Sequence, residues 1–479
     1  MANKAAIIGG GVIGGGWAAR FLLNGWTVRV YDPDPRAEEK INEVMFNARR
    51  SMPGLYDEKL PLEGELIFCD TVAEAVADAD WIQESVPERL ELKQAVYPQI
   101  QAAAPASAVI GSSTSGFKPS ELAAGALRPE QIIVTHPYNP VYLLPIIEVV
   151  PHPGTDPAIT ARAQKLLISV GMKPIVIRKE IEAHVGDRLL ESVWREALWM
   201  IKDDVATTSE IDDIMRFGFG IRWAQMGLFE TYRVAGGEAG MAHFIAQFGP
   251  TLKWPWSKLM DVPELDEELT NKIASQSDAQ SGHHSIRELE RIRDNNLVAM
   301  MRALKKQGWG AGETLLEHDV TLSDAQAEID WSKPVATLHR AVPIDWTDYN
   351  GHMSEIYYLE AFSRATDRLM EMIGCDADYI ATGGSYFTAE THIRHIDETH
   401  AGATIHANTQ MIVGAGKKLH LFHSLYEGDR LLATGEHFLL HVALETRKTA
   451  PPGPAVAALL ETAMAGQSQL PFPEGAGKV

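Results

Sequence analysis

Short apolar runs that alternate with helical stretches occupy the first 180 residues or so of the chain. A strand of a parallel sheet reads as a nearly continuous apolar run, because helices cover both of its faces. Five runs fit this pattern: Ala5–Ile8, Thr27–Tyr31, Trp81–Gln83, Ala108–Ile110 and Gln131–Val134. Strands and helices that alternate in this way predict a doubly wound α/β domain of the Rossmann type, which we place at residues 1–183.

A helical pattern follows the α/β region. Apolar residues recur at every fourth position from Val185 to Ile201, which is one face of a long helix. Helical signals continue to about Leu316. Residues 317–333 are acidic, contain few large apolar residues and end before a proline, as interdomain linkers do. We therefore predict an all-α helical domain at residues 184–330.

The remaining residues, 331–479, predict a small α+β domain. One amphipathic helix, with apolar positions from Ile356 to Ile373, precedes four long β-rich runs. These runs are Ser385–Ile396, Thr404–Val413, Leu419–Tyr426 and Leu431–Leu444, with glycine-containing turns between them. The tail after Thr449 is rich in Pro, Ala and Gly, so we expect its end to be loosely ordered.

Composition restricts the classes of partner. The 479 residues include 64 acidic and 43 basic side chains, which gives a formal charge of -21 and disfavours binding to nucleic acid or to an anionic membrane. No apolar run of about 18 residues and no signal-peptide pattern occurs, so we expect a cytoplasmic protein. The two cysteines, Cys69 and Cys375, lie far apart and indicate neither a disulfide framework nor a thiolate metal site. We expect no metal.

A glycine-rich turn directly follows the first predicted strand and opens a helix. Its residues are Gly9, Gly10, Gly11, Val12, Ile13, Gly14 and Gly15. Glycines allow a tight turn and a close approach of the backbone to a pyrophosphate at the helix N-terminus. Asp32 ends the next predicted strand, 18 residues after Gly14. An acid at this position binds the ribose hydroxyls and repels a 2'-phosphate, so the expected cofactor is NAD rather than NADP.

Three further segments carry a family resemblance. They are Trp81–Glu88, Gly111–Ser115 and His136–Pro140, with Glu148 twelve residues after His136. In order and spacing these segments resemble the 3-hydroxyacyl-CoA dehydrogenase superfamily over about residues 4–315. Their details are most similar to the branch that holds λ-crystallin, L-gulonate 3-dehydrogenase and L-carnitine dehydrogenase. The resemblance implies that Glu88 and Lys93 lie beside the cofactor.

The chemistry of alcohol oxidation agrees with this resemblance. A base must take the hydroxyl proton while hydride leaves the carbon, and a histidine suits that role near neutral pH. We assign His136 as the base, Glu148 as the acid that holds its tautomer and stabilises the imidazolium, and Ser115 as a hydrogen-bond partner of the reacting oxygen. For an isolated His and Glu, a structural histidine and a solvated acid would be the preferred interpretation. The complete family pattern favours catalysis.

Two departures from the acyl-CoA members of the superfamily concern the substrate. Ser113 and Asp187 stand where those members carry Asn, and the segment between Asp32 and Asp70 is shorter than the helical hairpin they use around CoA. We therefore expect a free hydroxy acid in this site rather than an acyl-CoA.

Aromatic residues are concentrated in the predicted helical domain, where nine occur between Phe217 and Trp256. Aromatic faces bind quaternary ammonium groups, although packing in a helical core explains most such residues. The candidates for substrate contact are Trp223, Phe229 and Tyr232, with Arg222 for a carboxylate and Asp187 for a nearby cation. Arg222 fits an ordinary ion pair equally well, and Asp187 fits a pair with Arg188. A hydroxy acid with a carboxylate at one end and a trimethylammonium group at the other describes carnitine.

A second motif, Asp345–Met353, precedes the helix of the C-terminal domain. It resembles the signature of hotdog-fold acyl-CoA thioesterases of the 4-hydroxybenzoyl-CoA type, and the resemblance covers roughly residues 335–450. By resemblance, Asp348 attacks the thioester or activates water, and N–H groups near Gly351 and His352 bind the oxyanion. Ser354 stands where the family often has Asn. The plainer alternative is an Asp-rich turn that caps a helix.

Together the two resemblances imply a bifunctional enzyme of carnitine breakdown. One half would oxidise L-carnitine to 3-dehydrocarnitine with NAD, and the other would hydrolyse betainyl-CoA to glycine betaine and CoA. The alternatives are a dehydrogenase for L-gulonate or another 3-hydroxy acid, a 3-hydroxyacyl-CoA dehydrogenase with a general thioesterase, and a crystallin-like structural protein that binds NAD. The expected partners are small molecules and, from the resemblance, a second copy of the chain in a homodimer or larger homo-oligomer.

Overall fold

A computed structural model describes residues 3–235, 240–248, 250, 257–258, 261–323 and 329–479. The chain forms two compact units. The first consists of Met1–Arg49 and Pro61–His318, and the second of Arg50–Leu60 and Asp319–Val479. Among the helices in the described residues, none has the length and apolarity needed to span a bilayer.

The first unit contains an eight-stranded sheet with the order β3-β2-β1-β4-β5-β6-β7-β8. All five predicted strands are present, and β3, β7 and β8 were not expected. The strands are parallel except that β6 and β7 pair in the antiparallel sense. Their bounds are β1 Lys4–Ile8, β2 Thr27–Tyr31, β3 Leu66–Phe68, β4 Trp81–Glu84, β5 Val109–Ser112, β6 Ile132–Pro137, β7 Ile146–Val150 and β8 Lys173–Val176.

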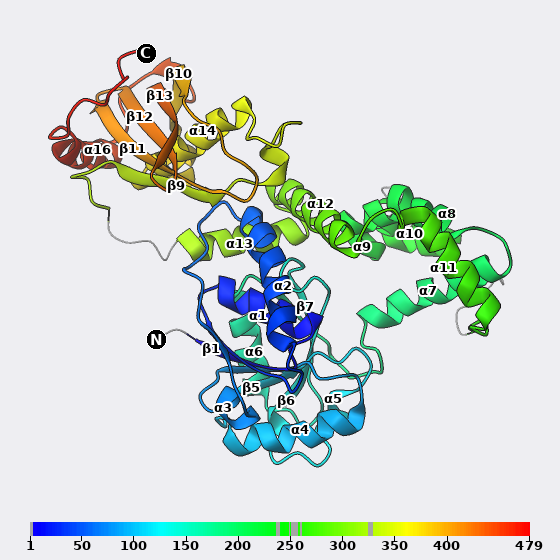
Figure 1. Ribbon diagram of the computed structural model, residues 1–479. Coiled ribbons are helices and arrows are strands. Elements are labelled where there is room, and N and C mark those ends of the chain that lie inside the picture. The colour runs from blue at the N-terminus through cyan, green and yellow to red at the C-terminus, as the bar shows by residue number, and fades with distance from the viewer. Residues whose placement is uncertain (1–2, 236–239, 249, 251–256, 259–260, 324–328) are drawn as a thin grey trace. The chain divides into compact units, whose positions relative to one another are not determined.

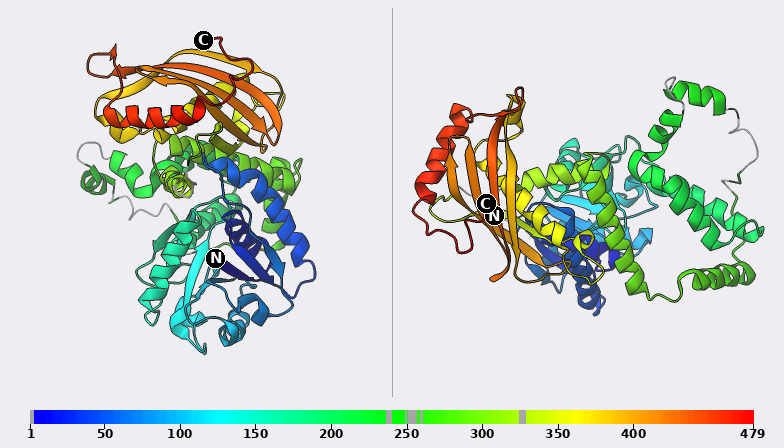
Figure 2. Two further views of the ribbon diagram at one scale, coloured as in Figure 1. Left: turned by 90° about the vertical axis from the view of Figure 1, so that its left-hand side faces the viewer. Right: turned by 90° about the horizontal axis from the view of Figure 1, so that it is seen from above.

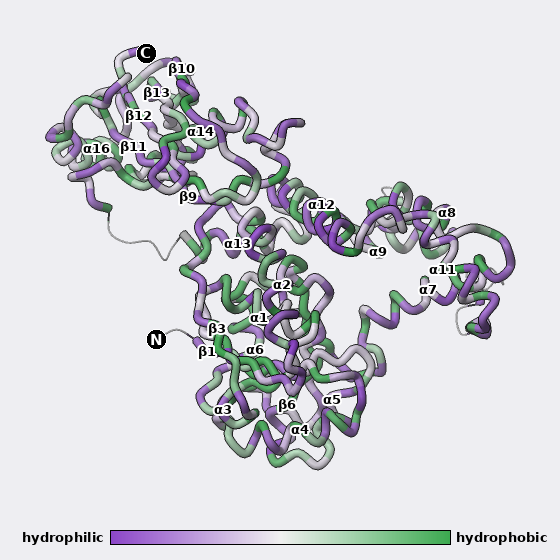
Figure 3. The backbone as a smooth tube through the Cα atoms, viewed as in Figure 1, coloured by the Kyte–Doolittle hydropathy of each residue, from purple (hydrophilic) through white to green (hydrophobic). Residues whose placement is uncertain are grey.

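Helices cover this sheet and complete the predicted Rossmann-type α/β fold (Figure 1). They are α1 Val12–Leu23, α2 Ala37–Ser51, α3 Val72–Val76, α4 Leu90–Ala103, α5 Pro119–Leu122 and α6 Pro157–Ser169. Helix α1 is buried from Gly14 to its end, so the glycine-rich turn stands at the edge of the core. The hydropathy colouring in Figure 3 shows hydrophobic residues concentrated in strands such as β1, where Ala5 to Ile8 are all buried.

The predicted all-α region follows β8. Its helices are α7 Gly186–Lys202, α8 Thr208–Ile214, α9 Gly220–Ala235, α10 Gly240–Phe248, α11 Glu267–Ser281, α12 Ile286–Lys306 and α13 Ala311–Ser323. The amphipathic helix predicted from Val185 to Ile201 is α7, but only Leu198 and Ile201 of its residues are buried. Leu189 and Trp194 are 58% and 57% exposed. The apolar face of α7 is therefore largely uncovered in the single chain.

The second unit has the predicted α+β hotdog architecture, in which a long antiparallel sheet packs against one helix. The main path of the sheet is β10-β13-β12-β11-β9, and β14 pairs with β13. Helix α14 lies against the sheet (Figure 2), and its Tyr358, Phe362 and Ala365 belong to the same buried cluster as Ile405 and Leu425 of the strands. The bounds are β9 Val335–Ala341, α14 Glu355–Met372, α15 Ala377–Ala381, β10 Gly384–His395, β11 Thr404–Ala415, β12 Lys418–Glu427, β13 Arg430–Ala443, β14 Lys448–Thr449 and α16 Pro454–Gln467.

The expected loose order concerns only the end of the tail, and the part before that end forms a helix that the sequence pattern did not predict. Residues Pro454–Gln467 form α16, which buries Val456, Leu460 and Ala463 in the same cluster as Met411 of β11. Proline is favourable at the first position of a helix and alanine is the best helix former. The composition that suggested loose structure therefore also suits a helix once an apolar face is available to cover.

Candidate active sites

The glycine-rich turn joins β1 to α1 with its backbone in close contact with neighbouring segments. Gly9 has a φ of +105°, and a Cβ there would lie 2.5 Å from the carbonyl oxygen of Ser85. A Cβ at Gly11, by contrast, would meet nothing within 4 Å, so the start of α1 is open to a ligand. The Asp32 carboxylate, just after β2, accepts a hydrogen bond of 2.6 Å from the Gly10 N–H. These features suit the pyrophosphate and ribose of a dinucleotide.

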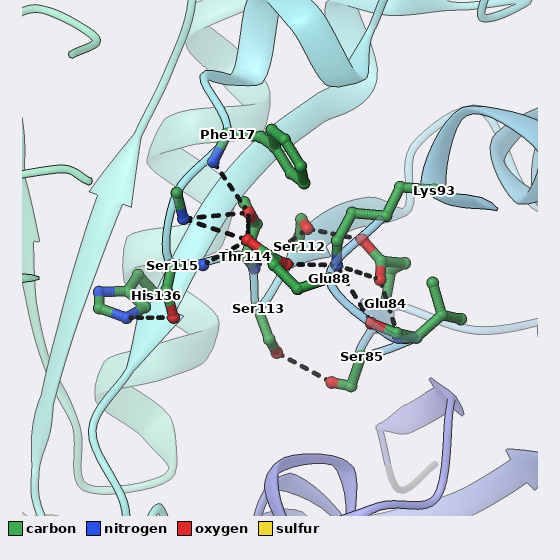
Figure 4. Close-up of polar contacts among 12 residues, drawn as sticks. Glu84, Ser85, Glu88, Lys93, Ser112, Ser113, Thr114, Ser115, Phe117 and His136 are labelled. Atoms are coloured by element: carbon green, nitrogen blue, oxygen red, sulfur yellow. Dashed lines mark hydrogen bonds and ion pairs between the residues drawn. The ribbon is translucent and has the colours of Figure 1, made fainter. Parts of the chain in front are cut away.

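His136 and Glu148 face each other across the antiparallel pair β6–β7, where they are direct register partners. His136 Nδ1 lies 2.9 Å from Glu148 Oε2, and both residues are 4% exposed. On the other side of the ring, His136 Nε2 lies 3.3 Å from Ser115 Oγ. The structure thus brings the three predicted residues into one chain of contacts, with the outer imidazole nitrogen directed at the serine, as Figure 4 shows for His136 and Ser115.

Glu148 is held at both carboxylate oxygens. Oε1 accepts hydrogen bonds from the N–H groups of Val185 and Gly186, at 3.0 and 3.1 Å. Oε2 accepts from Tyr138 at 3.1 Å in addition to His136. Burial acts to raise the pKa of Glu148, but the hydrogen bonds from His136, Val185 and Gly186 outweigh it and lower the pKa below its usual value. Glu148 is therefore a carboxylate at neutral pH, suited to stabilise an imidazolium.

Three residues near His136 received no predicted role. The Tyr138 hydroxyl contacts Glu148, and a Cβ at Gly186 would overlap that hydroxyl. Only glycine at position 186 therefore lets the start of α7 come this close to Tyr138 and Glu148. The buried His184 lies with its ring 5.4 Å from that of His136, and its Nε2 lies 3.1 Å from the Thr114 carbonyl oxygen. Burial, followed by the charge of His136, lowers the pKa of His184. Only the presence of Tyr138 within the family motif could have indicated any of these residues.

Glu88 and Lys93 belong to a network that holds the Ser115 loop (Figure 4). Glu88 Oε1 accepts hydrogen bonds from the N–H groups of Ser115 and Gly116, at 3.2 and 3.1 Å, and from the Thr114 hydroxyl. Lys93, which is 1% exposed, places its Nζ 2.9 Å from Glu84 Oε1 and 3.2 Å from Glu88 Oε2. Glu88 therefore fixes the position of the Ser115 backbone, and Lys93 links Glu88 to the buried Glu84.

The predicted substrate residues fall into two groups. Asp187, in the first turn of α7, lies with Oδ2 3.7 Å from His136 Nε2 and thus belongs to the cluster around His136. The other four, Arg222, Trp223, Phe229 and Tyr232, lie on α9. Within the described residues no hydrogen bond or ion pair joins these four to His136. Phe229 is 73% exposed, and Tyr232 stacks on Phe244 of α10. Trp254 and Trp256 of the aromatic cluster lie outside the described residues.

Asp348 stands on the exposed turn before α14. Its Oδ1 accepts hydrogen bonds from the N–H groups of Asn350 and His352, at 2.8 and 3.3 Å. The Gly351 N–H donates to the Asp348 carbonyl oxygen at 3.0 Å, and Gly351 has a φ of +81°. Both N–H groups expected to bind an oxyanion are thus engaged within the turn. They become available to a thioester only if the turn exchanges these hydrogen bonds for the ligand.

The fold and these sites define a dehydrogenase of the 3-hydroxyacyl-CoA type joined to a thioesterase-like domain. The family model for the 3-hydroxyacyl-CoA dehydrogenase NAD-binding domain matches residues 4–181, and the model for its C-terminal domain matches residues 184–273. The model for the thioesterase-like superfamily matches residues 342–460. The N-terminal domain is therefore of the NAD-binding type.

More specifically, the chain belongs to the family of L-carnitine dehydrogenase/betainyl-CoA thioesterases. A relative with that name from Ruegeria pomeroyi is 67% identical over 479 residues, which cover 99% of this chain and 98% of the relative. One from Agrobacterium fabrum is 54% identical over 99% of this chain and 97% of the relative. An L-carnitine dehydrogenase from Mesorhizobium japonicum matches 70% of this chain and 92% of its own length at 59% identity.

A solved structure shares the dehydrogenase fold. It is 5-formyl-3-hydroxy-2-methylpyridine 4-carboxylic acid 5-dehydrogenase, an NAD+-dependent dismutase, which is 29% identical and has a TM-score of 0.57. The match covers 64% of this chain and 99% of that one. The chain is thus similar in fold to an NAD+-dependent dehydrogenase.

Proposed function

We propose that this chain oxidises the 3-hydroxyl group of L-carnitine with NAD and hydrolyses betainyl-CoA to glycine betaine and CoA. The observation that carries the proposal is the Ser115–His136–Glu148 arrangement in a chain that matches the named bifunctional relatives over its full length. We assign NAD binding to residues 1–183, the helical substrate domain to 184–330 and the thioesterase to 331–479.

NAD fits the residues at the start of α1. The open position at Gly11, the tight turn at Gly9 and the Asp32 carboxylate match the pyrophosphate and the adenosine ribose. We extend this cofactor site to the whole run from Gly9 to Gly15, and we keep Glu88 and Lys93 beside the cofactor. The bound cofactor would supply the hydride acceptor, and the protein's own residues would supply the proton chemistry.

The path of the substrate proton follows from the geometry around His136. Glu148 keeps the Nδ1 proton in place, so Nε2 is the free base that takes the proton of the substrate hydroxyl. The Ser115 hydroxyl, 3.3 Å from Nε2, would donate to the same substrate oxygen as it becomes a carbonyl. The positive charge that develops on His136 lies beside two carboxylates, those of Glu148 and Asp187. Both carboxylates stabilise this developing charge and thus favour the forward step.

Asp187 also offers a reason for preferring a cationic substrate. A carboxylate 3.7 Å from the catalytic nitrogen attracts a trimethylammonium group and repels a second acid in the substrate. We propose that Arg222 binds the substrate carboxylate and that Trp223, Phe229 and Tyr232 of α9 contribute aromatic faces. No contact between α9 and His136 within the described residues supports these four, so they rest on residue chemistry alone.

The exposed apolar residues of the helical region support a homodimer. Leu189 and Trp194 of α7 and Phe217 and Phe229 farther along are 57–80% exposed. Large exposed apolar side chains gathered in one region of a chain are typical of interfaces between proteins. We propose that a second copy of the chain covers them, and that the protein works in the cytoplasm, where NAD and CoA thioesters are available.

In the thioesterase half, we propose that the Asp348 carboxylate attacks the thioester carbon or activates the water that does so. Either route ends with the acyl carbon bonded to the oxygen of water and with the CoA sulfur released as the thiol. Asp348 is exposed, as a residue that meets a large substrate must be. Gly351 and His352 would turn their N–H groups from Asp348 to the developing oxyanion.

A substrate panel tests the proposal with the full-length chain. NADH formation is followed with L-carnitine, L-gulonate, 3-hydroxybutyrate and 3-hydroxybutyryl-CoA, and thiol release is followed with betainyl-CoA and acetyl-CoA. We expect the highest kcat/KM for L-carnitine and for betainyl-CoA. Equal or faster turnover of 3-hydroxybutyrate, which lacks the trimethylammonium group, would contradict the dehydrogenase part of the proposal.

A further inference from the structure

Three metal-ligand side chains converge beside the Asp348 turn. His352 closes that turn, and Glu398 and His400 come from the segment between β10 and β11. His352 Nδ1 lies 3.4 Å from Glu398 Oε2, and the rings of His352 and His400 are 4.7 Å apart. One donor atom from each of the three side chains lies within 4.8 Å of the others. The proposed hydrolysis makes no use of Glu398 or His400.

The backbone beneath this cluster is fixed. His352 and His400 pair as an antiparallel bridge, and the Met353 N–H donates to the carbonyl oxygen of the buried Thr399 at 2.8 Å. Arg430 donates to the Glu398 carbonyl oxygen, also at 2.8 Å. The Cα positions of the three residues are therefore set by hydrogen bonds that do not involve the side-chain donor atoms. The side chains are partly or fully exposed, so an ion can reach them from solvent.

We propose that His352, Glu398 and His400 form a binding site for a divalent cation of the Zn²⁺, Co²⁺ and Ni²⁺ class. Two imidazoles and one carboxylate suit these borderline ions, whereas Mg²⁺ and Ca²⁺ prefer oxygen ligands alone. Three protein ligands leave a fourth position for water or another ligand. The sequence shows no metal-ligand motif here, because Glu398 lies 46 residues after His352 and the three side chains meet only in the folded chain.

The spacing of the donors agrees with such an ion after a small movement. Ligand bonds of about 2.0–2.1 Å place two donors on a tetrahedral ion roughly 3.4 Å apart. The His352–Glu398 pair already has this separation, at 3.4 Å. All the donor atoms of the cluster lie within 4.8 Å of one another, so closing on one ion takes movements of roughly 1.4 Å or less. The exposed His400 side chain can supply this movement by giving up the contact of 3.3 Å between its Nδ1 and the Gly351 carbonyl oxygen.

Calorimetric titration of the full-length chain with ZnCl₂ and CoCl₂ tests the site. We expect one equivalent of ion at this site, and we expect Glu398→Gln and His400→Asn each to weaken its binding by at least about tenfold. The visible spectrum of bound Co²⁺ should lose intensity in His400→Asn. The adjacent pair His283 and His284, with rings 4.2 Å apart, is the matched control, and replacing both by Asn should leave the affinity unchanged.

Two results would overturn the proposal. The first is unchanged affinity and stoichiometry in both Glu398→Gln and His400→Asn. The second is loss of the bound ion in the His283 and His284 double variant, which would locate the ion in the turn between α11 and α12. Because Glu398 and His400 are exposed, neither variant should unfold the chain, and an unchanged far-UV circular dichroism spectrum and thermal unfolding midpoint verify this.

Discussion

Replacing Glu148 by Gln removes one charge from the proposed catalytic cluster while keeping its shape. In the wild-type chain, Glu148 Oε1 accepts hydrogen bonds from two backbone N–H groups, at 3.0 and 3.1 Å, and Oε2 lies 2.9 Å from His136 Nδ1. A glutamine can keep its oxygen opposite those two N–H groups only by turning its NH₂ group toward His136. The reverse orientation would leave two backbone donors facing another donor, at a cost of about 1–3 kcal/mol each.

The consequence for His136 is a change of tautomer. An NH₂ group opposite Nδ1 makes that nitrogen an acceptor, so the ring proton moves to Nε2. A protonated Nε2 cannot take the proton of the substrate hydroxyl. Loss of a positioned general base costs about 10²–10⁴ in rate, and the wrong tautomer in a triad costs about 10⁴. We therefore expect kcat for L-carnitine oxidation to fall by about 10³-fold or more.

Stopped-flow or steady-state NADH formation measures this effect, with NAD affinity and thioester hydrolysis as internal controls that should not change. Tyr138→Phe is the matched variant, because it removes one donor to Oε2 but keeps the carboxylate and the His136 contact. It should cost roughly tenfold or less. A Glu148→Gln enzyme with turnover within roughly tenfold of the wild-type value would refute the reasoning that Glu148 sets the tautomer of His136.

Three more outcomes are expected. Glu84→Gln removes the buried carboxylate that lies 2.9 Å from the buried Lys93 ammonium. The free energy of unfolding in chemical denaturation should therefore fall by about 3–5 kcal/mol. A change below about 1 kcal/mol would mean that Glu88 alone compensates the charge of Lys93. Asp348→Asn should lower CoA release from betainyl-CoA by about 10²-fold or more with NADH formation intact, whereas Asp345→Asn should change neither. Burial, followed by the charges of Arg20 and Lys305, lowers the pKa of His318 to about 4, below the value of about 6.5 in the unfolded chain. Between pH 4 and 6.5 the unfolded state therefore binds a proton on His318 that the folded state does not bind. The contribution of His318 to the free energy of unfolding is complete above pH 6.5 and falls by about 3 kcal/mol toward pH 4. His318→Gln should reduce this fall in chemical denaturation at several pH values, and an unchanged pH profile would contradict the lowered pKa of His318.

Parts of the fold follow from the sequence because their patterns are local. The four long β-rich runs of the C-terminal domain differ from β10, β11, β12 and β13 by no more than two residues at either end. Alternation of apolar and polar residues marks such strands directly. Strand β7 escaped prediction because its identity depends on antiparallel pairing with β6. The helix α16 was missed because a Pro-, Ala- and Gly-rich segment is ambiguous until a partner surface is known.

The site divides in the same way. The twelve-residue spacing of His136 and Glu148 belongs to a family pattern, so the pair could be named before their cross-strand contact was seen. The contacts of the Val185 and Gly186 N–H groups with Glu148 could not be predicted. Backbone donors have no sequence signature, and these two lie 37 and 38 residues after Glu148. The orientation of α9 depends on packing between helices, which no local pattern records.

The central claim is that the His136 cluster oxidises L-carnitine. Its most direct test compares His136→Asn with the wild-type chain in one preparation, with NADH formation from L-carnitine and CoA release from betainyl-CoA measured side by side. The proposed mechanism predicts a loss of NADH formation by about 10²–10⁴-fold with CoA release unchanged. Undiminished NADH formation by His136→Asn, in protein that retains its CoA release, would contradict the claim.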